Sequence, residues 1–189
     1  MKLKLSWLLL PVILLLSFYV DSEAVAGKEA APGNYYTAVN IWWYKPMKIY
    51  STNYHRGEMI PAGTRVKITD ISSKRIYFTR KSDGKEFAIL RMKRHTKLPV
   101  DAHVKRLFSK KNPKGAGSKY SRFTKKEKRA VKHGLIFKGM SRDAAIMAYG
   151  YPPDHKTPNL KKNLWIYYKG LYVSWQLRFK NGKTANSLH

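Results

Sequence analysis

Hydrophobic and polar residues alternate with a period of two over residues 64–71 and 75–80, which is the pattern of half-buried β-strands. Strands are also predicted over residues 35–44, which are rich in Tyr, Val, Ile and Trp, over 47–50, and over 85–92, through Phe87 and Ile89. Ser82-Asp83-Gly84 is a hairpin turn sequence between residues 75–80 and 85–92. Residues 51–63, which contain one proline and two glycines, are predicted to form a long loop. Several short strands joined by tight turns predict a small β-barrel.

A short helix is predicted over residues 99–108, because Val104, Leu107 and Phe108 form an apolar stripe there. Residues 109–121 follow with one proline, two glycines and four lysines. This composition indicates a basic linker and therefore a boundary between two modules.

In the last third of the chain the apolar positions take the period of helices. Thr124-Lys125-Lys126-Glu127 is a capping-box sequence, in which the threonine and glutamate side chains accept hydrogen bonds from free amides at a helix start. The helix is predicted to run to His133 and to end at Gly134. A second helix is predicted between the N-cap Ser141 and Gly150.

Strand signals return after the second helix. Residues 164–168 and 171–179 alternate, with Lys169-Gly170 as the turn between them. Asn181-Gly182 is a strong two-residue hairpin sequence, and a short last strand is predicted from Lys183.

The predicted fold class is therefore α+β: a small β-barrel, then a module of two helices and a three-stranded antiparallel sheet. The predicted segments are a signal peptide at 1–26, a flexible start at 27–34, a β-barrel-like module with a terminal helix at 35–108, a basic linker at 109–121 and a second module at 122–189.

The first residues have the features of an export signal. Two lysines precede an uncharged run over residues 5–20, and Ala24-Val25-Ala26 fits a signal-peptidase site. The uncharged run is shorter than the ~20 residues of a membrane-spanning helix. We therefore predict cleavage after Ala26 and export to the periplasm or outer envelope; an uncleaved N-terminal anchor is the alternative.

Net charge narrows the class of partner. The chain has 189 residues and a net charge of +27, and its 43% hydrophobic content is sufficient for a packed core. For an exported protein of this charge we expect envelope proteins and anionic lipid, lipopolysaccharide or peptidoglycan as partners, whereas export disfavours nucleic acid. The absence of cysteine excludes disulfides, thiol nucleophiles and an acylated anchor cysteine. Any membrane contact is expected to be peripheral.

The strongest charge feature is residues 105–132, where twelve basic residues accompany a single acidic residue, Glu127. A charge run often forms only a solvated face, but this excess favours contact with an anionic surface. The candidate anion-binding residues are Lys105, Arg106, Lys110, Lys111, Lys114, Lys119, Arg122, Lys125, Lys126, Lys128, Arg129 and Lys132.

A second candidate site is the loop sequence Asn53, Tyr54, His55 and Arg56. In one interpretation Tyr54 stacks on a sugar or peptide while its neighbours hydrogen-bond to it. In the other, Asn53 forms a turn and Tyr54 fills the barrel. The adjacent residues of Trp42-Trp43 face opposite sides of a strand, so one is predicted to lie in the core and the other to be exposed or covered by the second module.

The sequence contains no recognisable catalytic or metal-binding motif. The six histidines are dispersed, the carboxylates have no paired spacing, and neither Gly-x-Ser-x-Gly nor His-Glu-x-x-His occurs. We therefore predict no catalytic residues, no metal site, no cofactor and a non-enzymatic function.

Four motifs occur in order in the second module, at residues 136–142, 149–152, 163–168 and 177–183. They are a Gly-Met-Ser helix start, a Gly-Tyr-Pro after that helix, a Trp-Ile-Tyr strand and a Phe-Lys-Asn-Gly-Lys hairpin. This arrangement, over about residues 124–189, resembles the SmpA/OmlA family, best known for a small lipoprotein of the outer-membrane β-barrel assembly machinery. The resemblance implies a two-helix, three-stranded fold and a non-enzymatic role in the envelope.

That family's lipoproteins begin at an acylated cysteine, which this chain lacks, so no lipid anchor is expected. Residues 50–57 and 60–64 resemble, more loosely, bacterial Src-homology-3-like barrels, which implies binding of cell-wall peptides. The predicted function is binding or scaffolding in outer-envelope assembly or integrity, with electrostatic contact to anionic envelope components. The alternative is a peptidoglycan-binding module or an accessory of a cell-wall enzyme.

Overall fold

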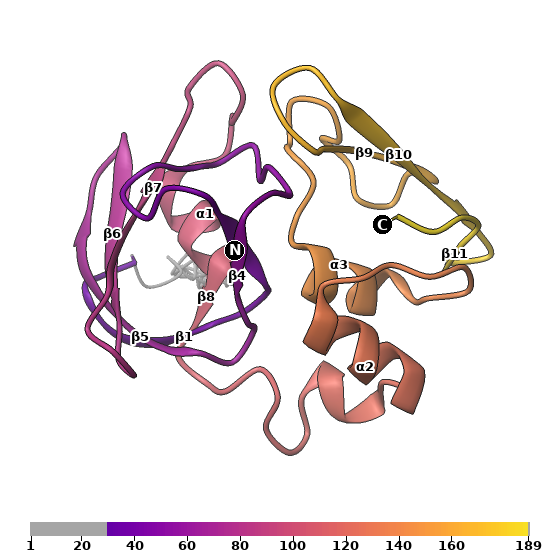
Figure 1. Ribbon diagram of the computed structural model, residues 1–189, viewed down its shortest axis with the longest axis horizontal. Helices are drawn as coiled ribbons and strands as arrows, with labels where there is room; N and C mark the ends of the chain where they lie inside the picture. The colour runs from indigo at the N-terminus through magenta and orange to yellow at the C-terminus, as the bar shows by residue number, and fades with distance from the viewer. Residues whose placement is uncertain (1–29, 189) are drawn as a thin grey trace, which may run out of the picture.

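The computed structural model describes residues 30–188, so the predicted signal peptide, residues 1–26, lies outside the described residues. Two bodies lie side by side, a strand-rich first module and a second module of helices and a small sheet (Figure 1). Within residues 30–188, no helix has the length and apolar character needed to cross a membrane.

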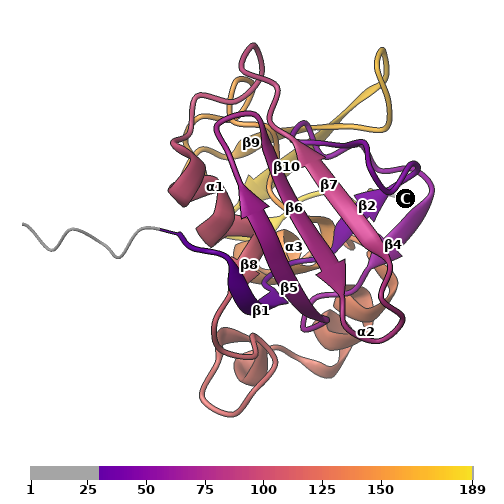
Figure 2. The ribbon, with the colours of Figure 1, turned by 90° about the vertical axis from the view of Figure 1, so that its left-hand side faces the viewer.

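The first module contains a sheet of six strands in the order β3-β7-β6-β5-β1-β8, and a separate pair formed by β2 and β4. Its elements are β1 (Gly33–Thr37), β2 (Ile41–Trp43), β3 (Ile49–Tyr50), β4 (Glu58–Ile60), β5 (Arg65–Ile71), β6 (Arg75–Arg80), β7 (Glu86–Leu90), α1 (Val100–Leu107) and β8 (Phe108–Ser109). The sheet curls into a half-barrel, whose central strands cross the view in Figure 2.

Alternation along the strands places one row of apolar residues inside the half-barrel. Val66 and Ile68 of β5, Phe78 of β6 and Phe87 and Ile89 of β7 are all buried. The Phe78 and Phe87 rings are stacked with their centroids 5.2 Å apart. The predicted strand periodicity is thus confirmed for the central strands.

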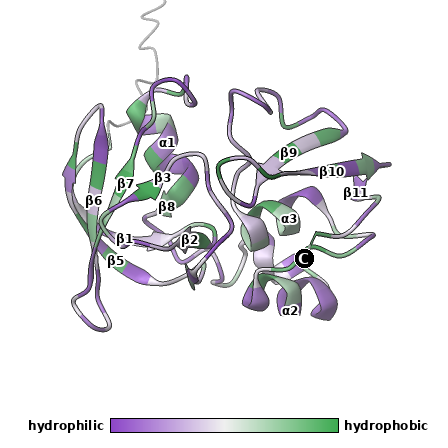
Figure 3. Cartoon of the chain, turned by 45° about the horizontal axis from the view of Figure 1, so that its top comes forward, coloured by the Kyte–Doolittle hydropathy of each residue, from purple (hydrophilic) through white to green (hydrophobic). Residues whose placement is uncertain are grey.

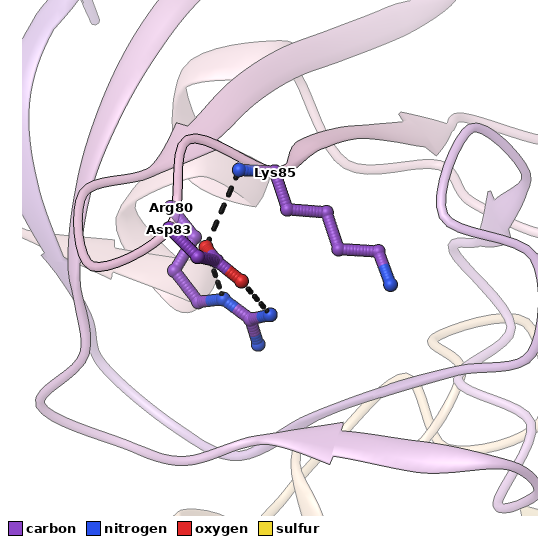
Figure 4. Close-up of polar contacts among 3 residues, drawn as sticks. All are labelled: Arg80, Asp83 and Lys85. Atoms are coloured by element: carbon purple, nitrogen blue, oxygen red, sulfur yellow. Dashed lines mark hydrogen bonds and ion pairs between the residues drawn. The ribbon is translucent and has the colours of Figure 1, made fainter.

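The predicted hairpin turn at residues 82–84 joins β6 to β7 (Figure 4). The Arg80 guanidinium forms an ion pair with Asp83, and its Nε donates to Asp83 Oδ1 at 2.9 Å. The amide of Lys85 also donates to Asp83 Oδ1, at 3.3 Å. The hydrogen bond from Arg80 is the main reason that the pKa of Asp83 falls to about 2.

The second module contains η1 (Lys119–Arg122), α2 (Lys125–His133), α3 (Arg142–Tyr149), β9 (Leu164–Tyr168), β10 (Ser174–Lys180) and β11 (Lys183–Thr184). The three strands form an antiparallel sheet in the order β11-β10-β9. Trp165, Tyr167 and Leu177 of this sheet are fully buried, as are Ala144 and Ala148 of α3. The small alanine side chains allow the helix to approach the large aromatic side chains closely.

Glu127 links the starts of the two helices. Its carboxylate accepts hydrogen bonds from the amides of Thr124, at 2.9 Å, and Ser141, at 2.8 Å, while Thr124 Oγ1 accepts from the Glu127 amide. Burial tends to raise the pKa of Glu127, but the hydrogen bonds from Ser141 and Thr124 outweigh it and lower that pKa overall. The predicted capping box is confirmed, and Gly134 ends α2 with a φ of 65°.

Three local predictions are wrong. The strand predicted over residues 35–44 is two strands of different sheets, β1 and β2, because the chain leaves the first sheet where the Asn40 amide donates to the Met147 carbonyl of the second module.

The predicted loop 51–63 contains β4, which pairs antiparallel with β2. Only three residues lie between Gly57 and Pro61, and this is too short for a visible alternation. The strand predicted from residue 171 begins instead at Ser174, because that residue pairs with Tyr168, the last residue of β9. Residues 171–173 are therefore an exposed turn.

Asn40 joins the two modules through its side chain. Its Nδ2 donates to the carbonyls of Val131 at 2.7 Å and Ala148 at 2.8 Å, and its Oδ1 accepts from the amide of Ala62 at 2.7 Å. The side chain thereby satisfies backbone groups of α2, α3 and the first module at once. Asn40 is only 1% exposed, so these bonds are shielded from water.

The two adjacent tryptophans lie on opposite sides of β2, as the alternation of side chains along a strand predicts. Trp43 is buried in the first module, with its ring centroid 5.4 Å from that of Phe87. Trp42 faces the second module, 6.3 Å from the ring of Tyr149. A Cβ atom at Gly134 would lie 2.6 Å from the Trp42 ring, so only glycine fits at that approach of the two modules.

Candidate functional site

The twelve basic residues between Lys105 and Lys132, here called the basic strip, run from α1 through the linker and η1 to α2. Three of them, Arg106, Lys114 and Lys128, are half-buried, and the other nine are exposed. Much of α2 has hydrophilic colouring in Figure 3. The strip cations of the second module therefore lie on η1 and α2 and not on its sheet.

The strip has almost no anionic partners within the molecule. Its one acidic residue, Glu127, is buried between the two helix starts. Lys119 forms an ion pair with Asp143 of α3, at 2.8 Å. Among the residues that the structure describes, the other eleven cations of the strip have no carboxylate within 4.0 Å.

Aromatic rings hold some cations of the strip in place. Lys110 Nζ lies 3.6 Å from the ring centroid of Tyr35, and Lys126 Nζ lies 4.4 Å from that of Phe137. In residues 30–188, Lys125, Arg129 and Lys132 of α2 have neither a ring nor a carboxylate in contact. The same holds for Lys105, Lys111 and Arg122, so six exposed cations of the strip are free to meet an external anion, three of them on α2.

The predicted ligand loop is divided between two environments, and Asn53 belongs to the inner one. Its φ is 53°, the left-handed conformation that asparagine tolerates. Its Nδ2 donates to the carbonyls of Tyr149, at 2.9 Å, and Tyr151, at 3.1 Å. Asn53 thus holds the first module against the segment that follows α3.

His55 is buried at the same junction. Its ring stacks on Tyr149 with centroids 3.7 Å apart, and its Nε2 lies 2.6 Å from the Tyr149 carbonyl oxygen. Its backbone amide donates to the carbonyl of Tyr168, at 3.0 Å. Burial lowers the pKa of His55 to about 4, against the opposing effect of the carbonyl contacts. The imidazole is therefore neutral at pH 7. Its single proton is assigned to Nε2, because the Nε2 contact is shorter than that of Nδ1, which lies 3.3 Å from the Tyr168 carbonyl oxygen.

Tyr54 and Arg56 line a cavity of about 130 Å³ on the first module. The Tyr54 ring also lies edge-on to Tyr168 of β9, with centroids 6.2 Å apart. The Arg56 guanidinium lies 4.8 Å from the ring centroid of Tyr44, and the Tyr54 ring packs edge-on against Tyr50. The lining also includes Lys45 and Lys48, which the sequence interpretation did not single out. The sequence feature that could have identified these two lysines is the basic Lys-Pro-Met-Lys segment directly after a run of aromatic residues.

The chain matches no protein-family model, no curated protein and no solved structure. The resemblances to the SmpA/OmlA family and to Src-homology-3-like barrels therefore stay predictions. The function has to be inferred from the residues and their geometry.

Chemically reactive side chains come together at one further place. The rings of His95 and His155 lie 4.6 Å apart, although 60 residues separate them in the chain. Asp154 accepts hydrogen bonds from Thr96 Oγ1, at 2.8 Å, and from the Lys97 amide, at 2.6 Å. Within residues 30–188, no three histidine or carboxylate side chains are grouped so as to hold a metal ion. These contacts connect loops of the two modules.

Proposed function

We propose that the protein is an exported, non-enzymatic binding or scaffolding protein of the bacterial outer envelope, whose basic strip contacts anionic envelope components. The observation that carries this proposal is the set of eleven strip cations without a carboxylate partner in the described chain. Cations that have no carboxylate partner within the protein remain available to lipid phosphates, lipopolysaccharide or peptidoglycan. The resemblance of the second module to the SmpA/OmlA family supports a role in envelope assembly or integrity.

The expected strength of this contact follows from electrostatics at a charged surface. Each basic residue near an anionic membrane surface contributes about 1 kcal/mol, and the attraction declines within a Debye length, ~8 Å at physiological salt. A flat surface can meet only part of the strip at once. Three or four engaged cations contribute about 3–4 kcal/mol, which is millimolar affinity, so tighter binding needs more of the strip or additional contacts.

Replacing four exposed cations of α2 by glutamine is expected to weaken binding to anionic vesicles and to peptidoglycan by roughly 30-fold or more. The variant carries K125Q, K126Q, R129Q and K132Q. The matched control removes the same charge from exposed positions of the first module, with K67Q, K74Q, K81Q and K93Q. Sedimentation with vesicles and with purified peptidoglycan at low salt gives the affinities. Equal losses in the two variants would show that only net charge matters.

A second function, recognition of a cell-wall peptide or saccharide carboxylate, is favoured by the cavity under Tyr54. Three cations, Lys45, Lys48 and Arg56, surround it together with tyrosine and tryptophan side chains, and no carboxylate lines it. Guanidinium and ammonium groups beside aromatic faces suit a ring-bearing ligand with an acidic group. The looser resemblance to Src-homology-3-like barrels supports this alternative.

The double variant K48Q/R56Q is expected to bind soluble peptidoglycan fragments about tenfold more weakly, because it loses charge-assisted hydrogen bonds to the ligand carboxylate. Titration calorimetry measures the change. The control R65Q/K67Q alters the same charge on the exposed face of β5. Fragments that bind both variants and the natural protein equally would rule out this cavity as their site.

A further inference from the structure

A groove of about 470 Å³ lies where α2 ends, within the basic strip. Its lining combines Lys126, Arg129 and His133 of α2 with Leu135, Ile136 and Phe137 of the segment that follows. Leu135 is 45% exposed, while Ile136 is fully buried. The groove therefore brings basic side chains together with an exposed apolar side chain, Leu135.

The backbone fixes this arrangement. Gly134 stops the helix in a left-handed conformation and sits against Trp42, and the amide of Leu135 donates to the Ala130 carbonyl at 3.0 Å. The chain then extends, and the Leu188 amide donates to the carbonyl of Ile136 at 3.1 Å. Because side chains alternate in an extended segment, Leu135 points outward where Ile136 points inward.

The charges around the groove are all of one sign. Lys126 Nζ lies over the Phe137 ring, 4.4 Å from its centroid, and Arg129 and His133 are exposed beside it. No carboxylate lines the groove. An occupant that complements both parts needs an anionic group next to an apolar one. A glycan or a soluble polyanion would leave Leu135 in water.

We propose that this groove docks on a bilayer of anionic phospholipid, with lipid phosphates at Lys126 and Arg129 and the acyl boundary covering Leu135. This inference rests on the proposed function and names lipid as the anion that the strip contacts. The docking is peripheral: an apolar side chain enters the headgroup boundary while the lysine and arginine stems extend their charges to the phosphates.

Separate substitutions of the apolar and cationic parts test the proposal. L135S is expected to weaken binding to vesicles of equal phosphatidylglycerol and phosphatidylcholine roughly tenfold, as the partial burial of one leucine predicts, and to leave binding to soluble polyphosphate unchanged. K126Q/R129Q is expected to weaken both. L164S is the matched control, because Leu164 of β9 is 42% exposed and lies outside the groove.

A direct probe covers the case in which L135S fails to fold. The fluorescence of L135W is expected to be quenched by brominated phosphatidylglycerol vesicles beyond the quenching of the natural protein, and that of L164W is not. Three results would show that lipid docking at the groove is wrong.

The first is that L135S binds vesicles as well as L164S does, and the second is that L135W shows no added quenching. The third is that L135S loses as much affinity for polyphosphate as for vesicles. If K126Q/R129Q still weakens vesicle binding in these cases, the anionic contact stands. If K126Q/R129Q changes neither the affinity for vesicles nor that for polyphosphate, the lipid proposal fails. If the four-residue α2 variant also binds as tightly as the natural protein, the proposed function fails with it.

Discussion

The N40D variant is expected to unfold at a temperature roughly 10 °C below that of the natural protein. Asn40 Nδ2 donates to the carbonyls of Val131 and Ala148. Aspartate has the same shape, but turns a carboxylate oxygen toward these two carbonyl oxygens. The buried carboxyl group must then lose both bonds or take up a proton, at a cost on the order of 4 kcal/mol.

Thermal and denaturant unfolding measure this loss. N34D is the matched control, because Asn34 is exposed on β1 and the charge change is the same. It is expected to alter the free energy of unfolding by no more than about 0.5 kcal/mol. Equal stability of N40D and N34D would contradict the role of Asn40 in joining the modules.

Mild acid is expected to destabilise the protein, with most of the loss between pH 6.5 and pH 4. The pKa of both His55 and His103 is lowered from 6.5 to about 4; burial is the largest cause for each, and for His103 the charges of Arg91 and Arg106 act in the same direction. Below pH 6.5 the unfolded chain binds protons that the folded chain excludes, so the free energy of unfolding falls as pH falls. Each histidine contributes up to about 3 kcal/mol of stability above pH 6.5, and this contribution is lost by about pH 4.

Unfolding by urea at half-unit steps from pH 7.5 to about pH 5.5 follows the first part of this loss, above the range in which carboxylates titrate appreciably. The double variant H55F/H103F keeps two rings that cannot titrate, and is expected to be less stable at pH 7 because the Nε2 bond to Tyr149 is gone. Its free energy of unfolding is nevertheless expected to vary much less with pH. A natural protein whose stability is flat over this range would contradict the buried neutral state of both histidines.

Local sequence signals predicted much of the fold. The capping box at Thr124, the stop at Gly134 and the turn at Asn181-Gly182 depend only on neighbouring residues, and all three occur in the structure. The parallel pairing of β3 with β7 does not follow from neighbouring residues. β3 is two residues long, and its position depends on packing against a strand almost 40 residues later in the chain.

The candidate site, too, could be predicted only in part from the sequence. The basic strip is a matter of composition, and its exposure follows because lysine and arginine are rarely buried. The roles of Asn53 and His55 could not be predicted, because their partners Tyr149 and Tyr168 lie 94 to 113 residues away. A polar loop next to aromatic residues has the same sequence pattern whether it meets a ligand or another part of its own chain.

The junction of the modules has a consequence for binding. Asn40, Asn53 and His55 tie the first module to the backbone of α2, α3 and the segments that follow them. The basic strip begins at the end of α1 and finishes on α2, so it spans this junction. The joined modules therefore fix the relative positions of these cations. An anionic surface can engage several of them without first ordering a flexible chain.

The salt dependence of binding to isolated bacterial envelopes tests the central claim most directly. The natural protein and the four-residue α2 variant are titrated onto envelopes from about 50 to about 500 mM NaCl, and the bound fraction gives the affinity at each salt concentration. Contact through the basic strip predicts that the affinity of the natural protein falls steeply with salt and that the α2 variant starts weaker and falls less steeply. Binding that is tight, independent of salt and equal for both proteins would contradict it.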